Sequence, residues 1–423
     1  MKQMIVNPEQ RSRAMAEAFS DPARCATRMI LLIACAVVGA GANGQESAAN
    51  LQDAIAGGDF DFEFRYRIET VDQAGFDEDA MASVLKSRVS FRPLDIGNLG
   101  FFIELDNVSY IGDDEFNNTR NGKTDFPLIG DPDGTHVNQA YVDFKNESGY
   151  IRLGRQRINL DEQRFVGGVA WRQNEQTMDA LTVVSNALPN VSLSYSYVHG
   201  VSRIWGPENG IPTDYFDSNT HLLNAGIDLA MGGRVVLYHY AMDLENGSAL
   251  SNQSTGVRFS QTVEGEELSF PFNLEYARQS DYADNPVPYE SDYLLLEGGV
   301  DTGDMRVLLG YETFGGDVSE PQKMFRMPMA TLHKFQGWTD RFLTIPQAGV
   351  KDTYVTFTTG GLTLTWHDFN SEAGSAHYGS EWDVSWQYAI GDNYTLLLKY
   401  ATYDPDTYAA DIDKAWIQFT ATF

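Results

Sequence analysis

The sequence predicts a transmembrane antiparallel β-barrel, and three observations lead to this fold class. An apolar segment near the N-terminus has the features of an export signal. Segments of about ten residues then alternate apolar and polar side chains along most of the chain, which is the pattern of strands that cross a bilayer. The links between these segments alternate between short and long, as the turns and loops of a barrel do.

The first element is a secretory signal peptide. Residues 29–42 read MILLIACAVVGAGA, and Arg24 and Arg28 precede this apolar run. Ala-Asn-Gly at 42–44 has the small-x-small spacing of a signal-peptidase site. Because the run is shorter than the ~20 residues of a permanent transmembrane helix, we expect cleavage rather than anchoring. Met29 or a start further upstream is an alternative beginning of the chain.

Both cysteines, Cys25 and Cys35, lie in the segment that we expect to be removed. The mature chain would then contain no disulfide, no thiolate nucleophile and no cysteine metal ligand. Cys35 follows Leu-Ile-Ala, so an acylated lipoprotein cysteine is the alternative. The predicted organisation is a signal peptide over 1–44, an N-terminal tail over 45–58 and a barrel over 59–423.

The strand pattern is clearest at residues 60–69, which read FDFEFRYRIE. One face of this segment is wholly apolar and the other wholly charged, as in a strand with lipid outside and a polar lumen inside. Eighteen such segments are predicted, with sixteen strands as the alternative if two are wrong. They are 60–70, 83–92, 99–108, 137–145, 150–157, 176–185, 191–200, 220–229, 234–242, 252–260, 267–279, 290–300, 304–313, 351–358, 361–370, 380–389, 393–402 and 414–423.

The links between these strands and the last residue complete the fold prediction. Short links such as 146–149 and 301–303 alternate with long ones such as 109–136 and 314–350, which predicts periplasmic turns and extracellular loops. The chain ends on a strand whose final residue is Phe423, which resembles the signal read by the barrel-assembly machinery of outer membranes. We therefore expect the outer membrane of a Gram-negative bacterium, with lipid and lipopolysaccharide around the barrel.

The net charge of −29 excludes a nucleic-acid-binding face, which would have to be basic. The acidity lies mostly outside the predicted strands. The strands hold 16 basic and 19 acidic residues, whereas the rest of the chain after residue 44 holds 9 basic and 37 acidic residues. The loops are therefore strongly negative, and the lumen is free to be basic.

Basic residues gather on the polar faces of the early strands. Arg65, Arg67, Lys86 and Arg88 all fall on lumen-facing positions of the alternation. They could form a constriction that attracts anions and pairs with their carboxylates. The alternative is that these side chains pair with wall carboxylates and select nothing. The wall carboxylates available for such pairing are Glu63, Glu69, Glu104 and Asp106.

The next basic group lies at residues 150–157. Strict alternation directs Arg152 inward and Arg155 and Arg157 toward lipid, which costs roughly 2–4 kcal/mol per arginine at the midplane. A β-bulge at Gly154 would turn both inward, and we expect that bulge.

Catalytic and metal-binding signatures are weak. The histidines are scattered and no G-x-S-x-G motif occurs, so we expect no enzyme. The acidic run at 113–115 does not have the spacing of an EF-hand loop, so no metal is expected. No cofactor is expected either.

Two stretches are similar to the alginate-export family of outer-membrane porins. Residues 154–181 read GRQRINLDEQRFVGGVAWRQNEQTMDAL, and residues 328–343 read PMATLHKFQGWTDRFL. The resemblance implies an eighteen-stranded monomer that passes an anionic uronate polymer through an arginine-lined pore, and a long loop folded into or over that pore. It gives the arginine role to Arg155, Arg157, Arg164 and Arg172, and places His333, Lys334, Trp338, Asp340 and Arg341 in the pore loop.

We therefore expect an outer-membrane channel or porin for an anionic saccharide such as an alginate-like uronate polymer or oligomer. A general or small-anion uptake porin is one alternative. A structural or adhesive barrel plugged by salt bridges and by the loop over 314–350 is the other.

Overall fold

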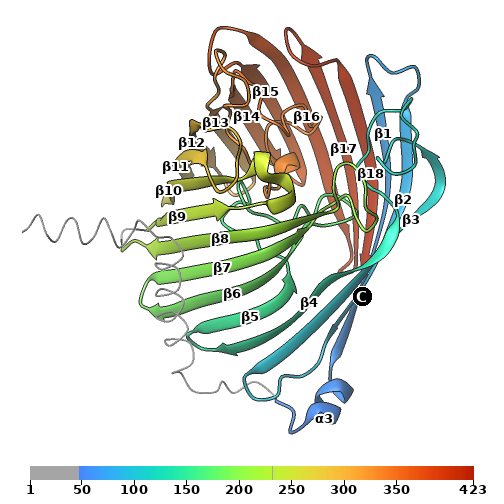
Figure 1. Ribbon diagram of the computed structural model, residues 1–423, viewed down its shortest axis with the longest axis vertical. Coiled ribbons are helices and arrows are strands. Elements are labelled where there is room, and N and C mark those ends of the chain that lie inside the picture. The colour runs from blue at the N-terminus through green and yellow to red at the C-terminus, as the bar shows by residue number, and fades with distance from the viewer. Residues whose placement is uncertain (1–46, 231) are drawn as a thin grey trace, which may run out of the picture.

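The computed structural model describes residues 47–230 and 232–423, and these residues form one closed antiparallel sheet of eighteen strands (Figure 1). The strands are β1 Asp59–Gln73, β2 Ala80–Arg92, β3 Leu99–Glu115, β4 Gly134–Asn146, β5 Gly149–Gln156, β6 Thr177–Leu188, β7 Val191–Ser202, β8 Tyr215–Asp228, β9 Arg234–Met242, β10 Asn252–Glu264, β11 Ser269–Asp281, β12 Glu290–Asp301, β13 Met305–Phe314, β14 Val350–Thr359, β15 Leu362–Asn370, β16 His377–Ile390, β17 Tyr394–Pro405 and β18 Ile412–Thr422. Neighbours in sequence are neighbours in the sheet, and β1 pairs with both β2 and β18, which closes the barrel.

The predicted eighteen-stranded barrel is confirmed, and each predicted segment overlaps one observed strand. The main difference is length. β3 continues to Glu115 and β8 begins at Tyr215, several residues beyond the predicted bounds. The apolar alternation stops where a strand leaves the hydrocarbon, whereas backbone pairing continues into the polar region above it. The signal peptide predicted over 1–44 lies outside the described residues.

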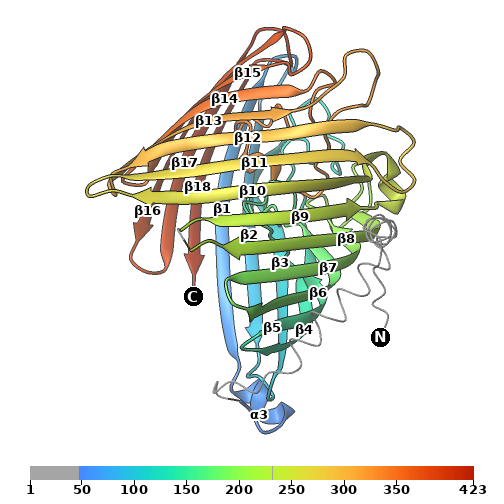
Figure 2. The same cartoon turned by 90° about the vertical axis from the view of Figure 1, so that its left-hand side faces the viewer.

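The two ends of the barrel differ in how the strands are joined (Figure 2). Turns as short as two residues, 147–148 and 360–361, join strands at the end that carries the C-terminus. Loops at the opposite end are longer, and the longest are 157–176 and 315–349. This asymmetry is that of periplasmic turns and extracellular loops. The helices of the described residues are α3 Leu51–Ala56 and the 3-10 helices η1 Glu245–Leu250 and η2 Leu332–Lys334.

The strands bury polar side chains inside and expose apolar ones outside. In β1, Phe60 is 58% exposed whereas Arg67 is 1% exposed. Exposed Leu309 and Trp382 continue the apolar outer surface on distant strands. Such a surface suits hydrocarbon rather than water. Within residues 47–230 and 232–423, no helix has the length and hydropathy of a membrane-spanning helix.

Candidate functional site

The loop 157–176, which we call the septum loop, crosses the lumen. Its side chains bind wall residues of six strands that lie around the whole barrel. The contacts are Arg157 to Glu104 on β3, Asp161 to Asn224 on β8, Glu162 to Arg258 on β10, Arg164 to Glu312 on β13, Arg172 to Glu69 on β1 and Glu175 to Arg88 on β2. A loop held on β1 to β3 and also on β8, β10 and β13 runs across the lumen.

Arg65 and Arg67 on β1 face the lumen as predicted, and both hold the backbone of the septum loop. Arg65 donates to the carbonyl oxygens of Ala170 at 2.8 Å and Arg172 at 2.5 Å. Arg67 donates to the carbonyl oxygen of Trp171 at 2.7 Å and lies over its indole ring. Their guanidinium groups are thus occupied by loop carbonyls.

Lys86 and Arg88 on β2 also face the lumen, and both are ion-paired. Lys86 lies 2.9 Å from Glu63, and Arg88 makes a bidentate pair with Asp106 at 2.7 Å. Both cations also face Glu175 of the septum loop. Pairing with wall carboxylates, the alternative in the sequence interpretation, is therefore what the structure contains at these positions.

Glu175 is the centre of the densest ionic cluster. Arg88 donates to it at 2.7 Å, and Lys86 and Arg157 also contact it. Burial would raise the pKa of the Glu175 carboxyl, but Arg88, Lys86 and Arg157 outweigh burial and hold this pKa well below its usual value. The carboxylate is ionised and fixes the end of the septum loop to β2.

The expectation of a bulge at Gly154 is wrong. β5 pairs without a register shift through this glycine on both sides. Arg155 therefore shares the outer face with Leu153, where it forms a 2.8 Å ion pair with Asp179. Gly154 instead permits a close approach, because a Cβ there would lie 2.3 Å from the carbonyl oxygen of Ala140.

Arg152 and Arg157, on either side of Arg155, point inward. Arg152 lies inside, 2.9 Å from Asp143 and over the Tyr141 ring. Arg157 follows the end of β5, so it reaches Glu104 without any bulge.

Arg164 and Arg172 complete the septum loop's attachment. Arg164 makes a bidentate pair with Glu312 at 2.7 and 2.9 Å. Arg172 contacts Glu69, Asp131 and Asp340, and these three carboxylates outweigh burial and raise its pKa above the usual value.

The second motif, residues 328–343, forms a segment that we call the tip, and it enters the barrel beside the septum loop. His333 is buried, with Nδ1 2.7 Å from Asp340 and Nε2 accepting a 2.8 Å hydrogen bond from Lys399 on β17. Asp340 also binds Lys414 on β18 at 2.8 Å. Burial would raise the pKa of Asp340, but His333, Lys414 and Arg172 hold it well below the usual value.

The remaining tip residues lie around this cluster. The Trp338 ring contacts the Lys399 ammonium at 3.7 Å, and its backbone N–H points to Asp383 on β16 at 3.2 Å. Lys334 donates to the carbonyl oxygen of Glu162 at 3.1 Å. The predicted pore loop therefore does fold into the barrel.

The two motifs, far apart in sequence, meet along their backbones. Val166 and Met329 form a parallel bridge, and the Gly167 N–H donates to the Met329 carbonyl oxygen at 2.9 Å. The Trp171 indole stacks on the His333 ring with centroids 4.6 Å apart. Together the septum loop and the tip form one layer across the lumen.

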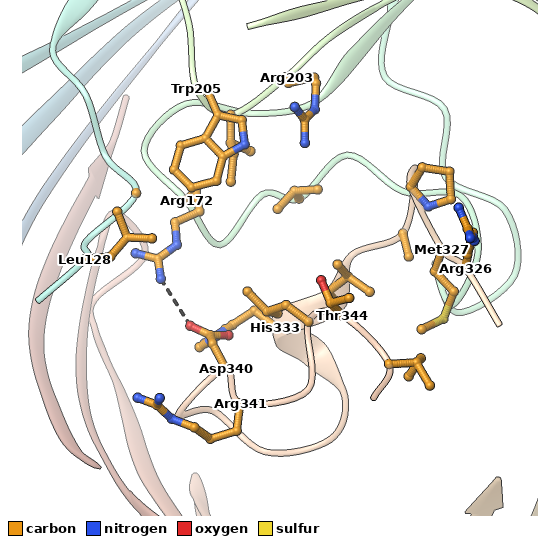
Figure 3. A pocket seen from close by; sticks show the side chains of 18 of the residues that line it. Leu128, Arg172, Arg203, Trp205, Arg326, Met327, His333, Asp340, Arg341 and Thr344 are labelled. Carbon is orange, nitrogen blue, oxygen red and sulfur yellow. Dashed lines mark hydrogen bonds and ion pairs between the residues drawn. The ribbon is translucent and has the colours of Figure 1, made fainter. Parts of the chain in front are cut away.

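A cavity of about 790 Å³ lies on the loop side of this layer (Figure 3). Its size is within the ~300–1,000 Å³ range of small-ligand sites. Arg172 and Asp340 form part of the wall and bind each other at 3.2 Å. We call it the loop-side cavity.

Three arginines of the loop-side cavity form no ion pair with any carboxylate of the described chain. Arg203 donates to the Thr213 carbonyl oxygen at 2.8 Å and stacks on Phe216. Arg326 donates to the Gln322 carbonyl oxygen at 2.6 Å, and Arg341 to the Gln73 side chain at 3.0 Å. They lie on different sides of the cavity (Figure 3).

Sequence reasoning found Arg341 and missed Arg203 and Arg326. Basic residues outside the strands are few, with 9 against 37 acidic ones, so each arginine in an acidic loop was a usable signal. What the sequence could not show is that three separate loop positions face one cavity.

Comparison with protein families supports the resemblance of the first motif. The model of a family described as "Alginate export" matches residues 57–193, which include the whole 154–181 stretch. The tip lies outside the matched range. No curated protein sequence matches the chain.

Several solved structures have a similar fold. OpdK of Pseudomonas aeruginosa, solved with vanillate, has a TM-score of 0.67 at 14% identity and covers 87% of this chain and 99% of its own. OccAB4 of Acinetobacter baumannii has a TM-score of 0.68 at 12% identity, over 90% of this chain and 99% of its own. Another OpdK structure, described as an outer membrane protein, has a TM-score of 0.66 at 15% identity, over 87% of this chain and 99% of its own. At such identities the likeness shows the fold.

The fold shared with these structures is a closed antiparallel β-barrel of eighteen strands. The barrel and the family match assign the chain to the outer membrane of a Gram-negative bacterium. The chain is an outer-membrane β-barrel channel that matches the alginate-export family over residues 57–193.

Proposed function

We propose that this channel passes small organic anions that carry a carboxylate, and that the loop-side cavity captures them. The observation that carries this proposal is the set of three guanidinium groups, Arg203, Arg326 and Arg341, that form no ion pair with a carboxylate within the described residues. Guanidinium binds carboxylate through charge-assisted and often bidentate hydrogen bonds. Guanidinium groups without an ion pair at the cavity would attract anions even though the protein as a whole is acidic.

The septum loop supports a small solute over a long polymer. Its arginines are paired to wall carboxylates, so Arg157, Arg164 and Arg172 hold the layer across the lumen rather than line an open tube. A bulky chain could pass only if this whole network opened. We infer that the predicted arginines shape the channel and that the cavity arginines select the solute.

An oligomer of uronic acids is the second candidate solute. It is favoured by the family match over residues 57–193 and by the carboxylate on each sugar unit. In this proposal the anions would still enter through the loop-side cavity and then meet Arg152 beyond the septum loop.

Ion selectivity in planar bilayers tests the proposal. We expect the wild-type channel to prefer anions in a salt gradient. Replacing Arg203, Arg326 or Arg341 with Met should lower the preference, because one unit charge near the path is worth ~1 kcal/mol, or about fivefold in local anion concentration. Arg278→Met is the matched control, since Arg278 is exposed on the outer face and paired with Glu290.

Cation preference in the wild type would contradict the proposal. So would equal anion selectivity in all three cavity variants and the Arg278→Met control. Retention of the barrel in each variant is checked by its heat-dependent gel mobility.

A further inference from the structure

The loop-side cavity has a mainly apolar wall. This wall restricts the chemical nature of the rest of a ligand that carries a carboxylate. Trp205 and Leu128 lie on one side and Met327 on another (Figure 3). Further apolar side chains complete the wall. They are Phe76, Leu250, Met324, Leu332, Leu343 and Ile345.

The arginines leave buried polar atoms without partners. Arg326 Nε and Arg341 Nε are both inaccessible and have no hydrogen-bond partner. Each of these guanidinium groups uses one Nη to contact a neighbouring residue. Because these Nε atoms are closed to the cavity, a carboxylate ligand would pair with the remaining Nη of each guanidinium group, which forms no ion pair within the described residues.

Arg203 adds a third cation with a lowered pKa. Burial, and to a smaller extent nearby Arg120, lower the pKa of its guanidinium to about 10, while Asp214 acts in the opposite direction. Arg203 stays charged at neutral pH. It therefore attracts an anion from the side of the cavity opposite Arg341.

We propose that the preferred ligand of the loop-side cavity is a carboxylate joined to an apolar, aromatic-sized body. This inference rests on the proposed function and names the class of its solute. A sugar acid presents hydroxyl groups on most of its carbons, and the apolar wall formed by Trp205, Leu128 and Met327 offers them few acceptors or donors. An aromatic ring has no hydrogen bonds to lose against this wall. Its apolar surface is removed from water there, which favours binding.

The two parts of such a ligand would bind to different sides of the loop-side cavity. The ring would pack against the indole of Trp205, and the carboxylate would face the guanidinium groups of Arg326 or Arg341. Arg172 would not contribute, because Asp340 and Glu69 already neutralise it. Specificity then comes from two independent requirements, an anionic group and an apolar body.

Binding to the purified full-length protein in detergent micelles tests this inference. The probes are benzoate, its neutral counterpart benzyl alcohol, and glucuronate, measured by titration calorimetry. We expect saturable binding of benzoate that is at least tenfold tighter than that of the other two. Arg326→Met and Arg341→Met should each weaken benzoate binding roughly tenfold.

Trp205→Ala separates the ring contact from the charge contact. It should weaken benzoate binding and leave the weak glucuronate binding unchanged, and Arg278→Met should change neither. Glucuronate binding as tight as benzoate binding would overturn this inference, as would equal binding of benzyl alcohol. Those results leave the proposed function standing if the channel still prefers anions in bilayers, whereas loss of anion preference would overturn the proposed function itself.

Discussion

The backbone N–H of Gly167 donates a 2.9 Å hydrogen bond to the carbonyl oxygen of Met329, and this bond joins two loops from opposite parts of the chain. The side chain of Gln176 donates to the same carbonyl oxygen at 2.9 Å. The Thr331 hydroxyl donates to the Gln163 side chain at 2.8 Å beside it. Three hydrogen bonds therefore join the septum loop to the tip.

The first prediction concerns Gly167, which has no room for a side chain. A Cβ at this position would lie 2.3 Å from Thr331 Oγ1 and 2.6 Å from Gln163 Cβ. Gly167→Val should separate the two loops and increase single-channel conductance in a planar bilayer.

The control for this substitution is Gly298→Val, on an outer strand face where a Cβ meets only an ordinary 3.4 Å contact. It should leave conductance unchanged. A Gly167→Val barrel that folds normally and conducts like the wild type would show that the two loops do not limit the path.

The barrel itself could be predicted from the sequence because it depends on a repeated local signal. Every strand needs an apolar side toward lipid and a polar side toward the lumen, so the period of two is imposed on each one separately. The same phase placed Arg65, Arg67, Lys86 and Arg88 inside. The alternation within each strand was therefore sufficient to predict which of these side chains face the lumen.

The site was harder to predict because it depends on which distant residues meet. Alternation says that Arg88 faces inward, but not that Glu175 of a loop neutralises it. The two motif stretches were both recognised, yet only the fold shows that Val166 pairs with Met329. At Gly154 a local rule gave a wrong prediction. The rule predicted a bulge, whereas the glycine allows the neighbouring backbone to approach closely.

The second prediction concerns the buried pair of Arg164 and Glu312, both less than 5% exposed. Arg164→Met would leave Glu312 buried without its cation. The substitution should therefore destabilise the attachment of the septum loop to the wall by about 3–5 kcal/mol. The septum loop would detach, while the barrel, held by its closed sheet, would persist. Limited proteolysis should then cut within residues 157–176.

Arg278→Met is the matched test for an exposed pair, since Arg278 and Glu290 are 57% and 67% exposed. This substitution should lower the stability of the protein by no more than about 1 kcal/mol, and it should create no new site of proteolytic cleavage. Equal protease sensitivity in the two variants would refute a special role for the buried pair.

The third prediction concerns Asp340, which neutralises Arg172 and Lys414 beside the loop-side cavity. Asp340→Asn would remove a negative charge and leave Lys414 without its ion pair, while Glu69 and Asp131 still contact Arg172. Anion preference, measured from the reversal potential in a salt gradient, should therefore increase. Glu320→Gln, in the same loop but 60% exposed, should have little effect. A fall in anion preference after Asp340→Asn would contradict the assigned charge balance.

The last prediction is a pH dependence that follows from Glu175. Its pKa is lowered in the folded protein, so its ion pairs contribute fully above the ordinary carboxyl pKa of 4.5 and are lost as the pH falls through the lowered value. Conductance should therefore be constant from about pH 8 to about pH 5 and increase only in stronger acid. Glu175→Gln, which is neutral at every pH, should show the increased conductance already at neutral pH. A conductance change centred near pH 6 to 7 in the wild type would assign the control to a histidine instead, because that is the ordinary range of the imidazole.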